Sequence, residues 1–155
     1  MKAEQQTESN QKNEINLYIS SDDILKSICQ LASKILEDQK KILILCAPDQ
    51  VNQIDSSLWT FGRNRFIPHI TSNDKNFDFA RQPIIITSEE NNFNNADYLI
   101  FTDAISSNFI GNFTRSFCFT GNENTKTTIL KNLGNSCKIS LHKKEGKKWL
   151  TENIS

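Results

Sequence analysis

The chain has 155 residues with a hydrophobic share of 37%, which is enough to bury one ordinary core without disulfides or a structural metal. Its 18 basic and 18 acidic residues cancel, so the molecule as a whole has no charge that would favour duplex DNA or anionic lipid. The start carries no signal-peptide pattern, and no apolar run approaches the roughly 18 residues that span a bilayer. We therefore expect a soluble, cytoplasmic protein without contact to a membrane.

Polarity divides the chain into two parts. Residues 1–13 are Gln, Glu, Asn and Lys with almost nothing apolar, which predicts a disordered tail. Residues 14–150 contain the apolar segments and are expected to form a single domain.

The first half of this domain alternates between strand and helix patterns. Residues 15–19 alternate as a strand does, and Ser and Asp at 20–23 supply a cap for a helix whose apolar face runs to Leu36. Residues 42–46 form a continuous apolar run, typical of a parallel strand covered on both faces. A second helix is predicted from Pro48 to about Leu58. This order predicts right-handed crossovers and an α/β sheet.

The segment from Trp59 to His69 follows this helix. It contains Trp59, Phe61 and Phe66, together with two Arg, and we expect neither regular helix nor central strand because Gly62 and Pro68 interrupt it. Aromatic and Arg side chains carry much of the binding energy at protein interfaces. These aromatics therefore either cover the core of their own domain or wait for a partner.

The second half repeats the alternation with shorter elements. We predict strands at 83–87, 98–102, 116–120 and 137–142, short helices at 105–113 and 122–133, and a turn at 143–146 before a returning segment at 147–149. The whole predicts a Rossmann-like three-layer α/β sandwich with a mostly parallel sheet.

Phosphate-binding motifs are missing from this framework. The five glycines are isolated from one another, so there is neither a P-loop nor a dinucleotide fingerprint, and no cofactor is expected. Asp22, Asp23 and Asp49 follow predicted strands, at the sheet edge where a metal- or nucleotide-binding enzyme would place its site. Helix capping explains these carboxylates more simply.

The four cysteines do not suggest a metal centre. Cys29, Cys46, Cys118 and Cys137 are widely spaced, and only two histidines accompany them. Reduced thiols in or near the core are the simpler interpretation. A cysteine nucleophile paired with His69 has no local support, so we expect no metal site and no catalytic residue.

Basic residues gather towards the end of the chain. Seven Lys lie between Lys126 and Lys148, against Glu145 alone. Such a run usually forms a solvated face. It would also suit an acidic peptide with a hydrophobic tip, because Ile129 and Leu130 lie beside it. Direct contact with nucleic acid is expected to be weak or absent, since no aromatics are interleaved for base stacking.

Several segments together resemble a known family. Residues 41–46, Leu58-Trp59 and Phe66-Ile67-Pro68-His69 resemble the chi subunit of bacterial DNA polymerase III holoenzyme. The segments 82–87, 95–103, 119–122 and 145–149 resemble the rickettsia-like, alphaproteobacterial sequences of that family. The similarity runs from about Ile15 to Trp149, and its specific part is Leu-Trp followed by Phe-x-Pro-His.

The resemblance implies a non-catalytic accessory subunit of the clamp-loader complex with two binding surfaces. One would bind the psi subunit, or a helicase at the same place, through Trp59, Phe66 and Pro68. The other would bind the acidic, Phe-ended C-terminal tail of single-stranded DNA-binding protein, with Lys126, Ile129 and Lys131 as positional counterparts. The family's basic, aromatic helix is altered here, because residues 127–133 contain no aromatic. His69 is expected to fix the loop by a hydrogen bond.

Overall fold

The computed structural model describes residues 13–20, 24–62, 67–74, 77–102, 105–133, 137–145 and 148–153. The expected tail, residues 1–13, lies outside the described residues except for Asn13, where the first strand begins. Asp22, Asp23 and Phe66 also lie outside them.

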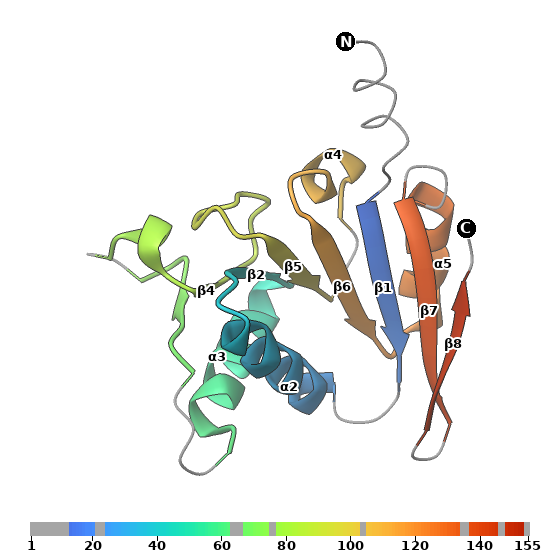
Figure 1. Ribbon diagram of the computed structural model, residues 1–155, viewed down its shortest axis with the longest axis horizontal. Coiled ribbons are helices and arrows are strands. Elements are labelled where there is room, and N and C mark those ends of the chain that lie inside the picture. Colours follow the sequence, from blue (N-terminus) through green and yellow to red (C-terminus); the bar gives the residue numbers. More distant parts are fainter. Residues whose placement is uncertain are drawn as a thin grey trace.

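A single eight-stranded sheet forms the middle of the molecule, in the order β3-β4-β2-β5-β6-β1-β7-β8 (Figure 1). Every neighbouring pair is parallel except β7 and β8, which are antiparallel. The strands are β1 (Asn13–Ile19), β2 (Ile42–Leu45), β3 (Ile70–Thr71), β4 (Ile84–Thr87), β5 (Tyr98–Phe101), β6 (Arg115–Thr120), β7 (Cys137–Glu145) and β8 (Lys148–Asn153). The predicted α/β class with a mostly parallel sheet is confirmed.

Helices cover both faces of the sheet and complete the three layers. On one face, α2 (Ile24–Glu37) and α3 (Val51–Thr60) pack on β2, β4, β5 and β6, where Ile44, Ile86 and Phe117 are buried. On the other face, α4 (Ser107–Ile110) and α5 (Glu123–Leu133) pack on a second cluster that includes Leu17, Phe101 and Ile139. The continuous apolar runs of the central strands are buried on both sides because both faces are covered.

The connections that follow the neighbouring strands β1 and β6 cross opposite faces of the sheet. From β1 the chain passes through α2 to β2, over one face, while from β6 it passes through α5 to β7, over the other. Because β6 and β1 are neighbours, the crevice at their carboxyl ends is a topological switch point, the place where open α/β sheets commonly bind ligands.

No described helix lies over β1, β7 and β8 on the α2/α3 side (Figure 1). Their side chains there are polar and aromatic. The ring of Tyr18 stacks between those of Phe119 and His142, with ring centres 4.8 and 4.5 Å away. The strands therefore keep a half-buried polar face where the helical layer stops.

Two local expectations were wrong. Helix α3 continues through Trp59 to Thr60 instead of ending before the aromatic segment, because the helix-breaking residue is Gly62 and not Trp59. The segment from Thr71 to Gln82, whose polar sequence predicts irregular structure, begins with the last residue of the edge strand β3 and contains a 3₁₀ turn at Phe79–Arg81. A two-residue strand is too short to show a period of two in the sequence.

All four cysteines are buried and none forms a disulfide. Burial, with a smaller contribution from the Asp49 carboxylate, raises the pKa of the Cys46 thiol to about 12. A thiol with so little thiolate at neutral pH is a packing residue rather than a nucleophile.

Candidate protein-docking site

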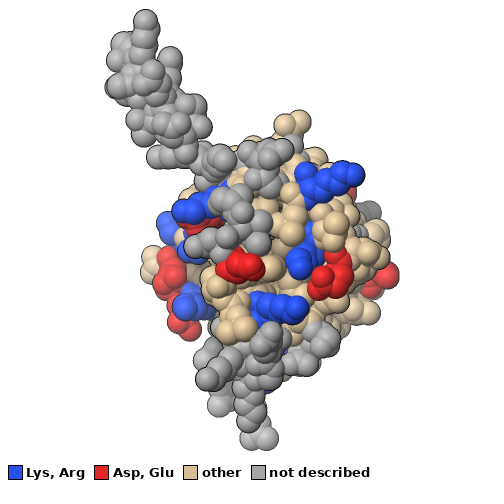
Figure 2. Space-filling view, turned by 90° about the vertical axis from the view of Figure 1, so that its right-hand side faces the viewer, with Lys and Arg blue, Asp and Glu red and all other residues tan. Residues whose placement is uncertain are grey.

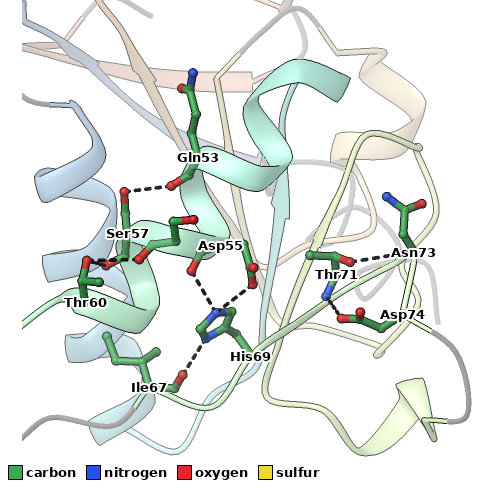
Figure 3. Close-up of polar contacts among 10 residues, drawn as sticks. Gln53, Asp55, Ser57, Thr60, Ile67, His69, Thr71, Asn73 and Asp74 are labelled. Carbon is green, nitrogen blue, oxygen red and sulfur yellow. Dashed lines mark hydrogen bonds and ion pairs between the residues drawn. The ribbon is translucent and has the colours of Figure 1, made fainter.

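The carboxyl end of α3 is held by hydroxyl groups that bond back to the helix (Figure 3). The Ser57 hydroxyl donates to the carbonyl of Gln53 at 2.8 Å, and the Thr60 hydroxyl donates to the carbonyl of Ser56 at 3.1 Å. Gly62 then takes a φ of 71°, a left-handed conformation that favours glycine. The last turn of α3 is thereby a defined platform before the chain turns away.

Trp59 lies on this last turn and is 55% exposed. Among the described residues, Phe77 and Leu150 are the other exposed large hydrophobic side chains, and they belong to a loop and to β8. The indole of Trp59 contacts the imidazole of His69, with ring centres 4.7 Å apart and planes inclined by 54°. An exposed indole supported from beneath is typical of interface anchors.

His69 is buried and bonds to both sides of the corner (Figure 3). Its Nδ1 lies 2.6 Å from the carbonyl oxygen of Ile67, and its Nε2 lies 3.0 Å from Oδ1 and 3.2 Å from the carbonyl oxygen of Asp55. The expected loop-fixing hydrogen bond is confirmed. Asp55 was not recognised in the sequence, although its position four residues before Trp59 puts both on one face of the helix.

The residues 58–69 divide between interior and surface. Leu58 and Ile67 are buried, and Phe61 is half-buried against the core beneath α2 and α3. Trp59 is exposed over about half of its surface and Pro68 is partly exposed. We call Trp59, Pro68 and the buried His69 with its partner Asp55 the docking corner. The described aromatics thus divide: Phe61 covers its own core, while Trp59 stays exposed, as the hypothesis of a partner at this surface requires.

An apolar hollow lies near this corner, between α2 and the end of α3. It has a volume of about 470 Å³ and is lined by Leu25, Lys26, Cys29, Ser57, Thr60, Phe61 and Gly62. Its lining combines the apolar side chains of Leu25, Cys29 and Phe61 with Lys26 and two hydroxyl residues. The hollow enlarges the surface that a docked segment could cover.

The second predicted surface is only partly present on α5. Lys131 is exposed, and Lys126 is partly buried, with its ammonium 3.5 Å from a carboxylate oxygen of Glu123. The side chain of Ile129, however, is 1% exposed and packs in the core with Leu133. The expectation that Ile129 touches a partner is therefore not met in this structure, because helical spacing turns that position towards the sheet.

Among the described residues, the lysines of the last third are divided between different surfaces. Lys138 and the core residue Ile139 are consecutive on β7, so Lys138 projects from the face opposite α5. Figure 2 views the side that carries β7, β8 and α5, and there Lys and Arg alternate with Asp and Glu. Any acidic peptide bound here would meet scattered point charges rather than a uniform positive field.

A polar cleft of about 450 Å³ lies at the switch point. Its lining includes Asp49, Gln50, Thr102, Thr120 and Asn122, and no Lys or Arg is among its lining residues. The side-chain oxygen of Gln50 accepts from the Thr102 hydroxyl at 2.8 Å. Within the described residues no group of three His, Cys, Asp or Glu side chains could hold a metal ion. None of the helices that the structure describes is long and apolar enough to cross a membrane.

Comparison with known proteins identifies the family. The family model of the DNA polymerase III chi subunit, HolC, matches residues 13–132, which include the docking corner and nearly all of α5. The chain belongs to the chi-subunit family of DNA polymerase III. The match covers the strands and helices that bring Trp59, His69 and Asp55 together.

Two chi relatives illustrate how far the similarity extends. A protein of Rickettsia prowazekii, named probable DNA polymerase III subunit chi, is 36% identical over 89 residues, covering 56% of this chain and 53% of the relative. The DNA polymerase III subunit chi of Pseudomonas aeruginosa is 29% identical over 92 residues, covering 59% of this chain and 62% of the relative. The matched part thus spans a little over half the length of these chi proteins.

Proposed function

We propose that the protein is a non-catalytic accessory subunit of the DNA polymerase III clamp-loader complex in the bacterial cytoplasm. It binds the psi subunit through the docking corner, and a helicase is the alternative partner at the same surface. Membership of the chi family supports a role in replication. The choice of psi or a helicase rests on the resemblance of Leu58-Trp59 and the Phe-Ile-Pro-His segment to that family, and the exposure of Trp59 supports docking at this surface.

The observation that carries this proposal is the presentation of Trp59. Trp59 lies at the end of a core helix, and more than half of its surface is exposed. Its side chain nevertheless packs on His69, which is buried and hydrogen-bonded. Leaving a large apolar side chain in water has no benefit for the isolated domain. Burying it against a partner releases that water, and its fixed position lowers the entropy lost on binding.

A second binding function is proposed for α5. Lys131 and Lys126 offer two ammonium groups on a helix whose apolar side is covered, which suits the acidic C-terminal tail of single-stranded DNA-binding protein. Because Ile129 is buried, the partly exposed Leu130 is the apolar side chain that remains to meet the terminal Phe of such a tail.

The first experiment is affinity purification of the full-length protein from its source cell, followed by identification of the co-purifying proteins. We expect subunits of the polymerase holoenzyme, with psi or a helicase in direct contact. A variant that carries both Trp59→Ala and Pro68→Ala is purified in parallel. Recovery of the same partner with the doubly substituted protein would assign that contact to another surface.

The cleft at the switch point supports a second candidate, a metal- or nucleotide-binding enzyme that uses Asp49. Such a ligand would bind the folded state and raise the melting temperature as its concentration increases. Thermal unfolding with magnesium ion, with ATP and with both therefore separates the two candidates. An Asp49→Asn variant identifies the cleft as the site if the shift disappears.

A further inference from the structure

His69 occupies an unusual position for a residue of a docking surface. Its side chain is completely buried, yet it adjoins the most exposed large hydrophobic side chain that the structure describes. A buried ring cannot touch a protein bound at the surface. Any influence of His69 on binding must therefore act through its neighbours.

The imidazole of His69 contacts Asp55, in the same part of α3 that carries Trp59. Asp55 and Trp59 are four residues apart, and in a regular α-helix the carbonyl of the first accepts the amide of the second. The Nε2 atom of His69 lies 3.2 Å from that carbonyl oxygen and 3.0 Å from Oδ1 of the same residue. The imidazole thus fits between the carboxylate of Asp55 and the indole.

The opposite side of the ring reaches into its own loop. Nδ1 lies 2.6 Å from the carbonyl oxygen of Ile67, directly before the partly exposed Pro68. All three partner atoms are oxygen acceptors, so a neutral ring donates to one side and an imidazolium to both. His69 therefore links the end of α3 to the segment that carries the second surface residue of the corner.

We propose that His69 is the positioning residue of the docking corner: it fixes the orientation in which Trp59 and Pro68 are presented, without contacting the partner. This inference rests on the docking function proposed above and adds the device that prepares the surface. An indole held in its bound orientation loses less rotamer freedom on association.

The first test measures Trp59 alone and needs no partner. A Trp149→Phe background leaves Trp59 as the single tryptophan of the full-length protein. Replacing His69 by Leu removes the polar contacts at similar volume. We expect a red-shifted emission maximum and a lower fluorescence anisotropy, with the far-ultraviolet circular dichroism unchanged. An unchanged emission maximum and anisotropy would overturn the proposal.

The second test measures binding to purified psi subunit. The Trp59→Ala and His69→Leu variants are each expected to weaken binding about thirtyfold, the loss typical of a hot spot. Because His69 acts through the indole as well as through Pro68, the loss in the double variant should fall well short of the product of the two single losses. Losses that multiply in the double variant would show a route independent of Trp59 and would contradict the proposal.

Asp55 provides a second approach in case His69→Leu does not fold. Its side chain is partly exposed, so substitution there is tolerated more readily. Asp55→Ala removes the side-chain acceptor of Nε2, leaves only the backbone carbonyl, and should weaken binding and mobilise Trp59, while Asp55→Asn keeps a side-chain oxygen and should restore both. Equal behaviour of the two variants would argue against positioning through this contact.

His142→Leu serves as the matched control, because this second histidine also has a partner at each ring nitrogen but lies on the far strands. It should leave Trp59 fluorescence and psi binding unchanged. Failure of wild-type protein to bind psi would refute the docking function only. The fluorescence of Trp59 would still decide whether His69 positions it.

Discussion

Gly121 lies so close to the carbonyl oxygen of Ser20 that a Cβ atom built at position 121 would come within 2.8 Å of it. The approach is fixed by backbone bonding, because the amide of Ser20 donates to the carbonyl of Thr120 at 3.1 Å. These residues end β1 and β6, at the point where the chain leaves the sheet in opposite directions. The contact therefore holds together the floor of the switch-point cleft.

Substituting Gly121 by Ala should destabilise the protein by about 1–3 kcal/mol, the usual cost of overpacking, because the opposing atom is backbone and cannot turn aside. Urea unfolding monitored by circular dichroism measures the change. Gly111→Ala is the control, since Gly111 is exposed and has right-handed helical dihedrals that alanine accepts. Equal stability of the two variants would mean that β1 and β6 can move apart there with little loss of folding free energy.

Trp59→Ala should reduce the affinity for psi by on the order of 2 kcal/mol or more and leave unfolding nearly unchanged. The reason is that the exposed indole contributes little to the core. Titration calorimetry and thermal unfolding measure the two quantities. Phe77→Ala and Leu150→Ala remove similarly exposed side chains elsewhere and should leave the affinity intact. Equal losses in all three variants would indicate nonspecific adhesion rather than docking.

Charge reversal on α5 should weaken binding of an acidic, Phe-ended peptide by roughly two- to fivefold per lysine, the range for exposed ion pairs. Lys131→Glu should have the larger effect, because Lys126 already pairs with Glu123 and must give up that contact. Fluorescence titration at two salt concentrations measures both affinity and screening. Lys138→Glu, on the opposite face of the sheet, is the control. An equal loss there would leave α5 without a specific role.

Patterns in the sequence were sufficient for most of the architecture. The runs at 42–46, 83–87 and 98–102 predicted buried strands because parallel strands covered on both faces need apolar side chains throughout. Those strands are neighbours in the interior of the sheet, and the helical spacing from Ile24 to Leu36 became α2. Long periodic segments carry the strongest local signal, which is why these elements were found.

The docking corner could be located in the sequence but not assembled from it. The aromatic composition of residues 59–69 predicted a surface for a partner, while the support of Trp59 by His69 and Asp55 depends on a tertiary contact across fourteen residues. The burial of Ile129 was missed for a related reason, because which face of α5 packs on the sheet is decided by tertiary structure and not by position in the sequence.

His142 sits between two side-chain partners on the polar face of β1, β7 and β8. Its Nε2 lies 3.0 Å from Oδ1 of Asn16, and its Nδ1 lies 2.9 Å from the hydroxyl of Thr151. A neutral ring satisfies both contacts, donating from Nε2 to the amide oxygen and accepting from the hydroxyl at Nδ1. Partial burial agrees with this, since it lowers the pKa of His142 from the usual 6.5.

This lowered pKa predicts a loss of stability on acidification. The unfolded chain binds a proton at His142 near its ordinary pKa of 6.5, while the folded protein does so only at lower pH. Unfolding therefore takes up protons in the interval below about pH 6.5, and the stability contribution present above that value is lost as the pH falls through it.

Urea unfolding at about pH 8 and about pH 5 measures the difference. Carboxylates also contribute to acid lability, so the informative quantity is the comparison with His142→Gln, which should lose less stability than wild type over the same interval. Parallel losses in the two proteins would mean that this imidazole is as easily protonated in the folded chain as in the unfolded one.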